Sequence, residues 1–259
     1  MLTFFAAAAF TSMMVFLACT PGCGGGGAVP GAALPAPVQV SFYGDSILSG
    51  GIKLMQPDGS TTPGWLNPLP VQRITALSAG RITGVDWSLP GATVQDARDG
   101  TPGMPFGPFA QAIKADSSRV VVIGYATANA LRFPRALAEY EATLADMVLE
   151  ARDAGKRVLL LGAPYIALPM PGQSADDSAA IAMRINIFDL ATKAVAARTG
   201  VRYIDLRQVV FFGVTDMADD VHPNQAYSAR LCALIALELG FAVEALPAAD
   251  FHQAHKTNG

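Results

Sequence analysis

Short apolar runs alternate with longer segments of helical periodicity from residue 38 onward, and this alternation constrains the fold more than any other feature of the chain. Residues 120–123 (VVVI) and 158–161 (VLLL) are continuous apolar runs of strand length. Such runs are typical of parallel strands that are buried on both faces. Because helical patterns separate the runs, the sequence predicts an α/β fold in which helices cover both faces of a parallel sheet.

Five strands and four helices can be placed on this pattern. The strands are expected at 38–43, 84–87, 120–123, 158–161 and 201–204, and the helices at 70–79, 137–154, 181–199 and 224–239. Gly155 and Gly200 are the expected ends of the second and third helices. A loop rich in glycine and proline crosses residues 100–108. Ligands of such sheets bind beyond the carboxyl ends of the strands, so the chemistry is expected in the loops that follow them.

Composition excludes several classes of protein. Of the 259 residues, 51% are hydrophobic and 15% are charged, whereas a disordered chain has low hydrophobicity and high charge. A net charge of −3 does not indicate the excess of basic residues that is typical of proteins that bind nucleic acid. We find no Walker motif, dinucleotide fingerprint or zinc-ligand spacing in the sequence, and we expect neither a cofactor nor a metal.

The N-terminal segment differs from the rest of the chain, because no charged residue precedes Asp45. Residues 1–18 are almost entirely apolar and resemble a secretory signal. Residues 19–37, rich in glycine, alanine and proline, read as a linker. We therefore expect an exported protein, periplasmic or in the outer cell envelope, with its domain at 38–246 and a polar tail at 247–259.

The end of the leader also suggests a lipid anchor. The sequence Phe-Leu-Ala-Cys at 16–19 resembles a bacterial lipoprotein signal, in which Cys19 would be acylated and would tether the protein to a membrane. Cys23, which precedes four glycines, is an alternative anchor. A third interpretation is a simple cleaved signal followed by a flexible tether, which would give a secreted protein.

Two short motifs carry candidate chemistry. Gly-Asp-Ser, ending at Ser46, directly follows the first predicted strand, where a strand-to-helix turn exposes the hydroxyl. His222 precedes the last helix, and Asp219 lies three residues before it. A carboxylate at this spacing can orient an imidazole and stabilise its protonated form. The other histidines, His252 and His255, lie in the polar tail.

These motifs, together with Gly91-Ala92-Thr93 after the second strand, resemble those of the SGNH (GDSL) hydrolase superfamily over about residues 38–240. The resemblance implies a flavodoxin-like three-layer sandwich that hydrolyses esters without a metal. It also implies that Ser46 is the nucleophile, His222 the general base and Asp219 the acid that orients the base. The backbone amides of Ser46 and Gly91 would contribute to the oxyanion hole.

One block departs from the family pattern. The family has roughly Tyr-Gly-x-Asn-Asp-Ala after the third strand, and its asparagine donates a hydrogen bond to the oxyanion; here residues 125–130 read YATANA. Without a gap, Ala128 stands at the asparagine position and Asn129 at that of the aspartate. Either Asn129 supplies the donor through a shift of one residue, or this donor is missing, which typically costs on the order of 10²–10³ in rate.

The sequence leads to two hypotheses of function. The first is a serine esterase or deacetylase that hydrolyses small acyl esters, such as those of an acetylated carbohydrate, and acyl transfer with the same triad is a variant of it. The second is a degenerate family member that binds a glycan or lipid at the cell surface with little turnover. The residues Ser46, His222 and Asp219 favour the first, and the altered third block favours the second.

Overall fold

The computed structural model describes residues 36–58, 60–132, 136–166, 174–241 and 243. The predicted leader, nearly all of the linker and the polar tail lie outside these residues, as do Cys19 and Cys23. The expectations about export and lipid attachment therefore stay predictions. Within the described part of the chain, no helix combines the length and the hydropathy needed to cross a membrane.

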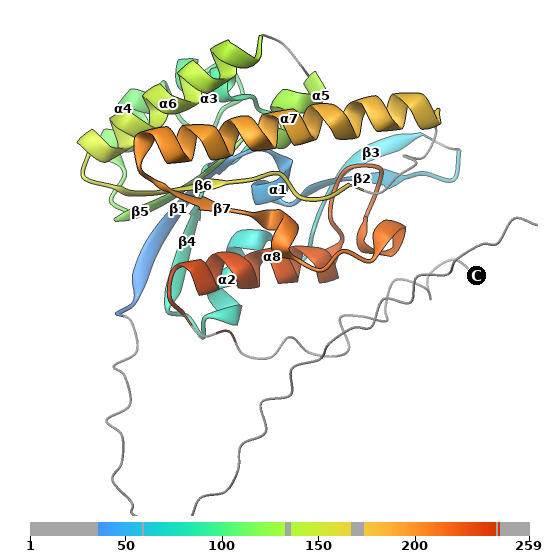
Figure 1. Ribbon diagram of the computed structural model, residues 1–259. Helices are drawn as coiled ribbons and strands as arrows, with labels where there is room; N and C mark the ends of the chain where they lie inside the picture. The colour runs from blue at the N-terminus through green and yellow to red at the C-terminus, as the bar shows by residue number, and fades with distance from the viewer. Residues whose placement is uncertain (1–35, 59, 133–135, 167–173, 242, 244–259) are drawn as a thin grey trace, which may run out of the picture. The chain divides into compact units, whose positions relative to one another are not determined.

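A five-stranded parallel sheet forms the middle layer of the fold, in the strand order β4-β1-β5-β6-β7 (Figure 1). Its strands are β1 (Val38–Gly44), β4 (Ile82–Asp86), β5 (Val120–Gly124), β6 (Arg157–Leu161) and β7 (Arg202–Ile204). Counted among themselves along the chain, these strands have the order 2-1-3-4-5, which is the flavodoxin-like arrangement. The predicted three-layer α/β/α sandwich is thus confirmed.

Helices cover the sheet on both faces (Figure 1). One layer contains α1 (Ser46–Ser49), α2 (Pro70–Leu77) and α8 (Gln225–Glu238). The other contains α3 (Val94–Asp99), α4 (Phe109–Ala115), α5 (Ala126–Arg132), α6 (Leu137–Asp153) and α7 (Ala175–Thr199). The short 3-10 helices η1 (Leu206–Gln208) and η2 (Gly213–Asp216) lie between β7 and α8.

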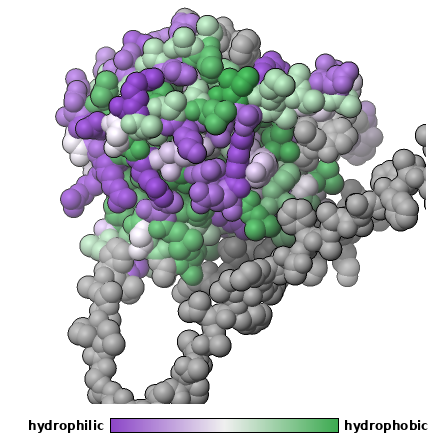
Figure 2. All heavy atoms as spheres, in the orientation of Figure 1, coloured by the Kyte–Doolittle hydropathy of each residue, from purple (hydrophilic) through white to green (hydrophobic). Residues whose placement is uncertain are grey.

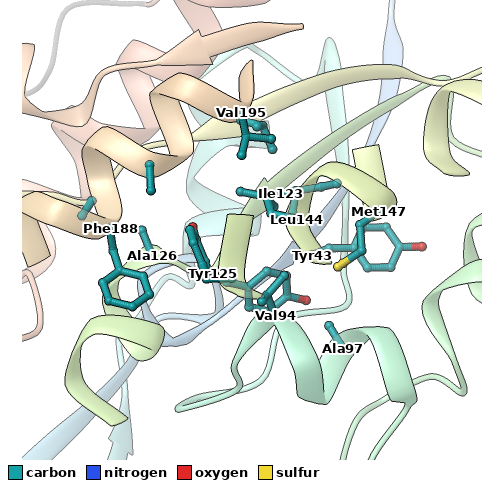
Figure 3. Packing of buried hydrophobic residues seen from close by; sticks show 14 of the residues in the cluster. Tyr43, Val94, Ala97, Ile123, Tyr125, Ala126, Leu144, Met147, Phe188 and Val195 are labelled. Atoms are coloured by element: carbon teal, nitrogen blue, oxygen red, sulfur yellow. The ribbon is translucent and has the colours of Figure 1, made fainter. Parts of the chain in front are cut away.

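The two layers account for the apolar runs. Along β5, Val121 and Ile123 belong to the core cluster on the α6 and α7 side, whereas Val120 and Val122 belong to the cluster on the α8 side. Successive side chains of a strand point to opposite faces, so a strand that is covered twice is apolar at every position. Figure 3 shows part of the first cluster, in which side chains of β1 and β5 meet those of α3, α6 and α7.

The helix ends follow the expected chemistry. Gly200 caps α7 in the left-handed conformation with φ of 69°, and Gly155, just after α6, has φ of 76°. Asn224 begins α8, because its side chain accepts a hydrogen bond from the Tyr227 amide. Cys232 of α8 is buried, and burial raises the pKa of its thiol to about 12.

Several elements differ from the sequence-based expectations. The second strand of the sheet covers Ile82–Asp86 rather than 84–87, since Thr83 and Gly84 interrupt its apolar pattern. The short helices α3, α4 and α5 were not expected, because none is long enough to show a clear helical period. A hairpin of β2 (Gly51–Met55) and β3 (Thr61–Trp65) was also not expected.

The surface is mixed in character. Figure 2 shows hydrophilic and apolar side chains interspersed over the face that it presents. Among the exposed apolar residues, Met183, Ile187 and Leu190 share one side of α7, and Trp65 lies at the end of β3.

Candidate active site

The first candidate residue lies where strand order changes direction in the sheet. Ser46 begins α1 directly after β1, and β1 lies between β4 and β5. A crevice forms at the carboxyl ends of the strands at such a switch point. Gly44 is required here, since a Cβ atom would lie 2.7 Å from the carbonyl oxygen of Gly124.

Asp45 joins the turn between β1 and α1 to helix α5. Its Oδ1 accepts a hydrogen bond from the Ile47 amide at 3.0 Å, and its Oδ2 accepts one from the Ala128 amide at 2.9 Å. The carboxylate thus caps α1 and also holds the beginning of α5. Burial raises the pKa of Asp45 to about 6, although both amide hydrogen bonds oppose the rise.

His222 lies on the loop before α8, and its ring connects Ser46 with Asp219. Its Nε2 is 2.8 Å from Oγ of Ser46, and its Nδ1 is 2.7 Å from Oδ2 of Asp219. An ionised carboxylate can only accept hydrogen bonds, so Nδ1 carries the proton and Nε2 is left as the acceptor. The three predicted residues therefore form one continuous hydrogen-bonded chain.

The Asp219 carboxylate is held by backbone amides as well as by the imidazole. Oδ1 accepts from the amides of Val221 and His222, both at 2.9 Å, and Oδ2 accepts from the Lys53 amide at 2.6 Å. Burial alone would raise the pKa of Asp219, but the hydrogen bonds from His222 and these amides outweigh it. The pKa of Asp219 consequently lies well below its usual range.

Asp220, the neighbouring acid, has a different partner. Its carboxylate pairs with the Lys53 ammonium at 2.9 Å. Lys53 therefore contacts both acids, Asp219 through its backbone and Asp220 through its side chain. This contact fixes the β2–β3 hairpin against the loop that carries His222.

A cavity of about 430 Å³ opens beside Ser46. Its lining includes Ser46, His222 and Gly91, with a wall from the hairpin that contains Ile52 and Trp65. Gly91 has φ of 76°, a conformation that favours glycine. Among the described residues, we find no hydrogen-bond acceptor for the amides of Ser46 or Gly91, so both donors remain available to a ligand.

The third block lies at the start of α5, and its two candidate positions point in different directions. Ala128 lines the cavity, whereas Oδ1 of Asn129 accepts a hydrogen bond from the buried Val94 amide at 2.9 Å. This hydrogen bond occupies the side-chain oxygen of Asn129 and not its Nδ2 donor, so the expectation that Asn129 supplies an oxyanion donor stays a prediction. Successive helical residues differ by about 100° around the axis, so Asn129 faces α3 when Ala128 faces the cavity.

Arg132 extends the side of α5 that faces the cavity. It lies one turn after Ala128 and lines the same cavity. Its Nη1 donates to the carbonyl of Gly91 at 2.8 Å and to Oδ2 of Asp96 at 3.1 Å. Arg132 thus holds the loop that carries the Gly91 amide.

Sequence reasoning missed Asp45, Lys53, Trp65 and Arg132 as residues of this site. One available signal was Pro-Asp-Gly at 57–59, because these residues favour a tight turn between two strands. No comparable pattern marks Lys53, whose contribution comes from its backbone. The described residues contain no group of three or more His, Cys, Asp or Glu side chains that could hold a metal ion.

Comparisons with solved structures show the same fold in several esterases. Est24, a carbohydrate acetylesterase from Sinorhizobium meliloti, is 18% identical with a TM-score of 0.60, and the match covers 78% of this chain and 98% of Est24. The Mycobacterium smegmatis aryl esterase gives the same values. Axe2, an acetylxylan esterase from Geobacillus stearothermophilus, is 20% identical with a TM-score of 0.57, covering 83% of this chain and 100% of Axe2.

The sequence itself also identifies a family. No curated protein matches the chain significantly. Residues 42–230, however, match the GDSL-like Lipase/Acylhydrolase family, and this region contains the strand-to-helix turn at Ser46 and the loop of Asp219 and His222. Since the match covers well over half of the chain, the protein belongs to the GDSL-like lipase/acylhydrolase family.

Proposed function

We propose that the protein is a serine ester hydrolase that removes small acyl groups, with acetylated carbohydrates as its substrate class. The observation that carries this proposal is the hydrogen-bonded chain from Asp219 through His222 to Ser46, with Nε2 of the imidazole 2.8 Å from the serine oxygen. This geometry suits a hydroxyl that loses its proton to an oriented base.

In the first half of the reaction, Oγ of Ser46 attacks the carbonyl carbon of the ester and its proton passes to Nε2 of His222. The carbonyl electron pair moves to the oxygen and leaves a tetrahedral oxyanion. When the intermediate collapses, the alcohol leaves with the proton from Nε2, and the acyl group stays on Ser46. The ionised Asp219 stabilises the imidazolium that exists between these steps.

In the second half, a water molecule attacks the acyl-enzyme while His222 takes its proton. The second tetrahedral intermediate releases the carboxylic acid, and Ser46 regains its proton from Nε2. If a sugar hydroxyl attacks in place of water, the same steps give acyl transfer. The chemistry of the chain itself is identical in the two cases.

The amides of Ser46 and Gly91 are the oxyanion donors in this proposal. Donors aimed at the developing charge each contribute roughly 2.7–4 kcal/mol in enzymes of this kind. Ala128 supplies no side-chain donor to the cavity, so we expect turnover that is slower than a site with three donors would allow. Arg132 acts as a positioning residue, because it holds the carbonyl of Gly91.

Two observations bear on the acyl group and the alcohol of the substrate. Est24 and Axe2 are described as a carbohydrate acetylesterase and an acetylxylan esterase, and both have the fold of this chain. The cavity beside Ser46, at about 430 Å³, lies within the range of about 300–1,000 Å³ that is typical of sites for small organic ligands. These observations favour an acetylated carbohydrate over a long-chain lipid ester.

A second candidate function is binding of a glycan or lipid with little turnover. Ala128 favours it, since an alanine lines the cavity at the position where the family pattern has its side-chain donor. A chain-length series of p-nitrophenyl esters, measured on the wild type and on Ser46→Ala, separates the two candidates. The hydrolase proposal expects the highest kcat/KM for acetate and loss of most activity in Ser46→Ala. Equal rates in the two proteins would support binding without catalysis by Ser46.

We also propose that the N-terminal segment exports the protein and that Cys19 anchors it to a membrane through a lipid. The apolar leader and the sequence at residues 16–19 support this. Metabolic labelling with a palmitate analogue should succeed for the wild type and fail for Cys19→Ser. Failure in Cys23→Ser instead would move the anchor to Cys23, and no labelling at all would indicate a protein without a lipid.

A further inference from the structure

A second cavity adjoins the one beside Ser46, and Trp65 lines both. Its volume of about 560 Å³ lies within the range of about 300–1,000 Å³ that is typical of sites for small organic ligands. The two cavities therefore share Trp65 as a lining residue. The mechanism proposed above makes no use of the second cavity.

The indole at this position is unusually open to solvent. Trp65 is 56% exposed, although tryptophan is highly buried on average in folded proteins. Its partner across the hairpin is Gly51, which has no side chain to cover the ring. A Cβ atom at Gly51 would lie 2.7 Å from the Pro90 ring, so the glycine is required by close packing. The hairpin thus presents the indole without cover from β2.

Besides Leu66 and Leu69, the remainder of the second cavity is lined with hydrogen-bonding side chains. Asn67 and Gln72 are exposed, and Asp86 and Ser88 are half-buried. The carboxylate of Asp86, the last residue of β4, accepts a hydrogen bond from the Ser88 amide at 2.9 Å, and this bond fixes the orientation of the carboxylate. Amides, a carboxylate and a hydroxyl provide both donors and acceptors around the aromatic ring.

We propose that this second cavity is a carbohydrate subsite, in which a sugar ring next to the acylated one stacks on Trp65. A pyranose has apolar C–H faces and a rim of hydroxyl groups. The open indole complements such a face, and Asn67, Gln72 and Asp86 complement the hydroxyls. This inference rests on the proposed ester hydrolysis at Ser46 and assigns its substrate as an oligosaccharide rather than a single acylated sugar.

The direct test is binding of neutral oligosaccharides that carry no O-acyl ester, measured by calorimetry on Ser46→Ala. A panel with xylose, glucose, mannose and N-acetylglucosamine backbones provides the probes. We expect at least one to bind, and Trp65→Ala in the same background to weaken it about tenfold, as expected for loss of one aromatic contact. Trp65→Phe should retain most of the affinity. No binding by any member of the panel would overturn the proposal.

Turnover provides an independent arm. Trp65→Ala should lower kcat/KM for a chemically acetylated oligosaccharide about tenfold more than kcat/KM for p-nitrophenyl acetate, and Asn67→Ala should change the same ratio in the same direction. Met55→Ala is the matched control, because Met55 is 70% exposed on the same hairpin and lines neither cavity. An unchanged ratio in Trp65→Ala, or a selective loss on long-chain esters instead, would overturn the subsite.

The two arms separate this proposal from the proposed function. Oligosaccharide binding that depends on Trp65, in a protein that hydrolyses no ester, would keep the subsite and refute the hydrolase. Ester hydrolysis through Ser46 with no effect of Trp65 on oligosaccharides would refute the subsite and keep the hydrolase.

Discussion

The backbone amide of Lys53 donates a hydrogen bond to Oδ2 of Asp219, with 2.6 Å between the nitrogen and the oxygen. Lys53 lies opposite Pro63 in the hairpin ladder, and proline has no N–H to donate. The Lys53 amide points away from β3 in this position and is available to the acid. An edge strand that sequence reasoning did not expect therefore helps to hold the residue that orients His222.

This contact predicts different outcomes for two substitutions at one position. Lys53→Pro removes the amide donor, and we expect kcat to fall by roughly tenfold, corresponding to about 1.5 kcal/mol for a hydrogen bond to a charged group. Lys53→Ala keeps the amide and loses an exposed ion pair, so its effect should stay within about threefold. Steady-state kinetics with p-nitrophenyl acetate measure both, and thermal unfolding shows whether each variant is folded. Equal kcat values in the two folded variants would contradict a role for the amide.

The third block gives a prediction that separates two neighbouring residues. Because Ala128 faces the cavity, Ala128→Asn should restore a side-chain donor and raise kcat, by up to about 10²-fold, while KM changes little. Ala128→Leu adds a similar volume without a donor and serves as the control. A rise in both variants, or in neither, would show that position 128 does not face the oxyanion.

Asn129→Ala should act on stability instead. It leaves the buried Val94 amide without its acceptor, and we expect a loss of about 1–3 kcal/mol in the free energy of unfolding. Urea denaturation monitors this loss, and kcat of the folded fraction should be nearly unchanged. A large fall in kcat at unchanged stability would instead assign the oxyanion donor to Asn129.

The buried Asp45 predicts how stability depends on pH. Its pKa is raised from 3.8 to about 6, so the folded state binds the proton more tightly than the unfolded state does. The contribution of Asp45 to stability is full below about pH 4 and is lost as pH rises through about 6. At about 1.4 kcal/mol per pKa unit, the free energy of unfolding changes by about 3 kcal/mol over this range. The lowered pKa of Asp219 has the opposite sign, since its stabilisation is lost as pH falls below its unfolded value.

Urea denaturation between pH 4 and 7 can isolate the contribution of Asp45. As pH rises across this interval, the wild type should lose unfolding free energy relative to Asp45→Asn, because asparagine does not ionise. Asp58→Asn is a suitable control, because Asp58 is an exposed acid on the hairpin turn. Parallel stability curves for the wild type and Asp45→Asn would show that Asp45 ionises normally.

The parts of the fold that could be predicted from sequence are those with strong apolar patterns. The strands at Val120–Gly124 and Arg157–Leu161 are buried on both faces, and their uninterrupted runs indicated this directly. The β2–β3 hairpin lacks such a pattern, because most of its side chains are exposed. Its existence depends on tertiary contacts, including those of Lys53 with the loop before α8.

The candidate site divides in the same way. Ser46, Asp219 and His222 could be proposed because their side chains carry the chemistry and lie at recognisable spacings. Asp45 and Arg132 act on backbone groups distant in sequence, the Ala128 amide and the Gly91 carbonyl. The direction of Asn129 depended on where α5 begins, and sequence spacing alone left both registers open.

Labelling with an alkyl fluorophosphonate tests the central claim most directly, because the reagent reacts with a serine that has been activated by a base. Mass spectrometry of the digested wild-type protein should find one adduct, on Ser46. Ser46→Ala should give no adduct. His222→Ala should give an adduct only slowly, because the Ser46 hydroxyl has then lost its base. An unlabelled wild type, or an adduct on another serine with full esterase activity in Ser46→Ala, would contradict the assignment of Ser46 as the nucleophile.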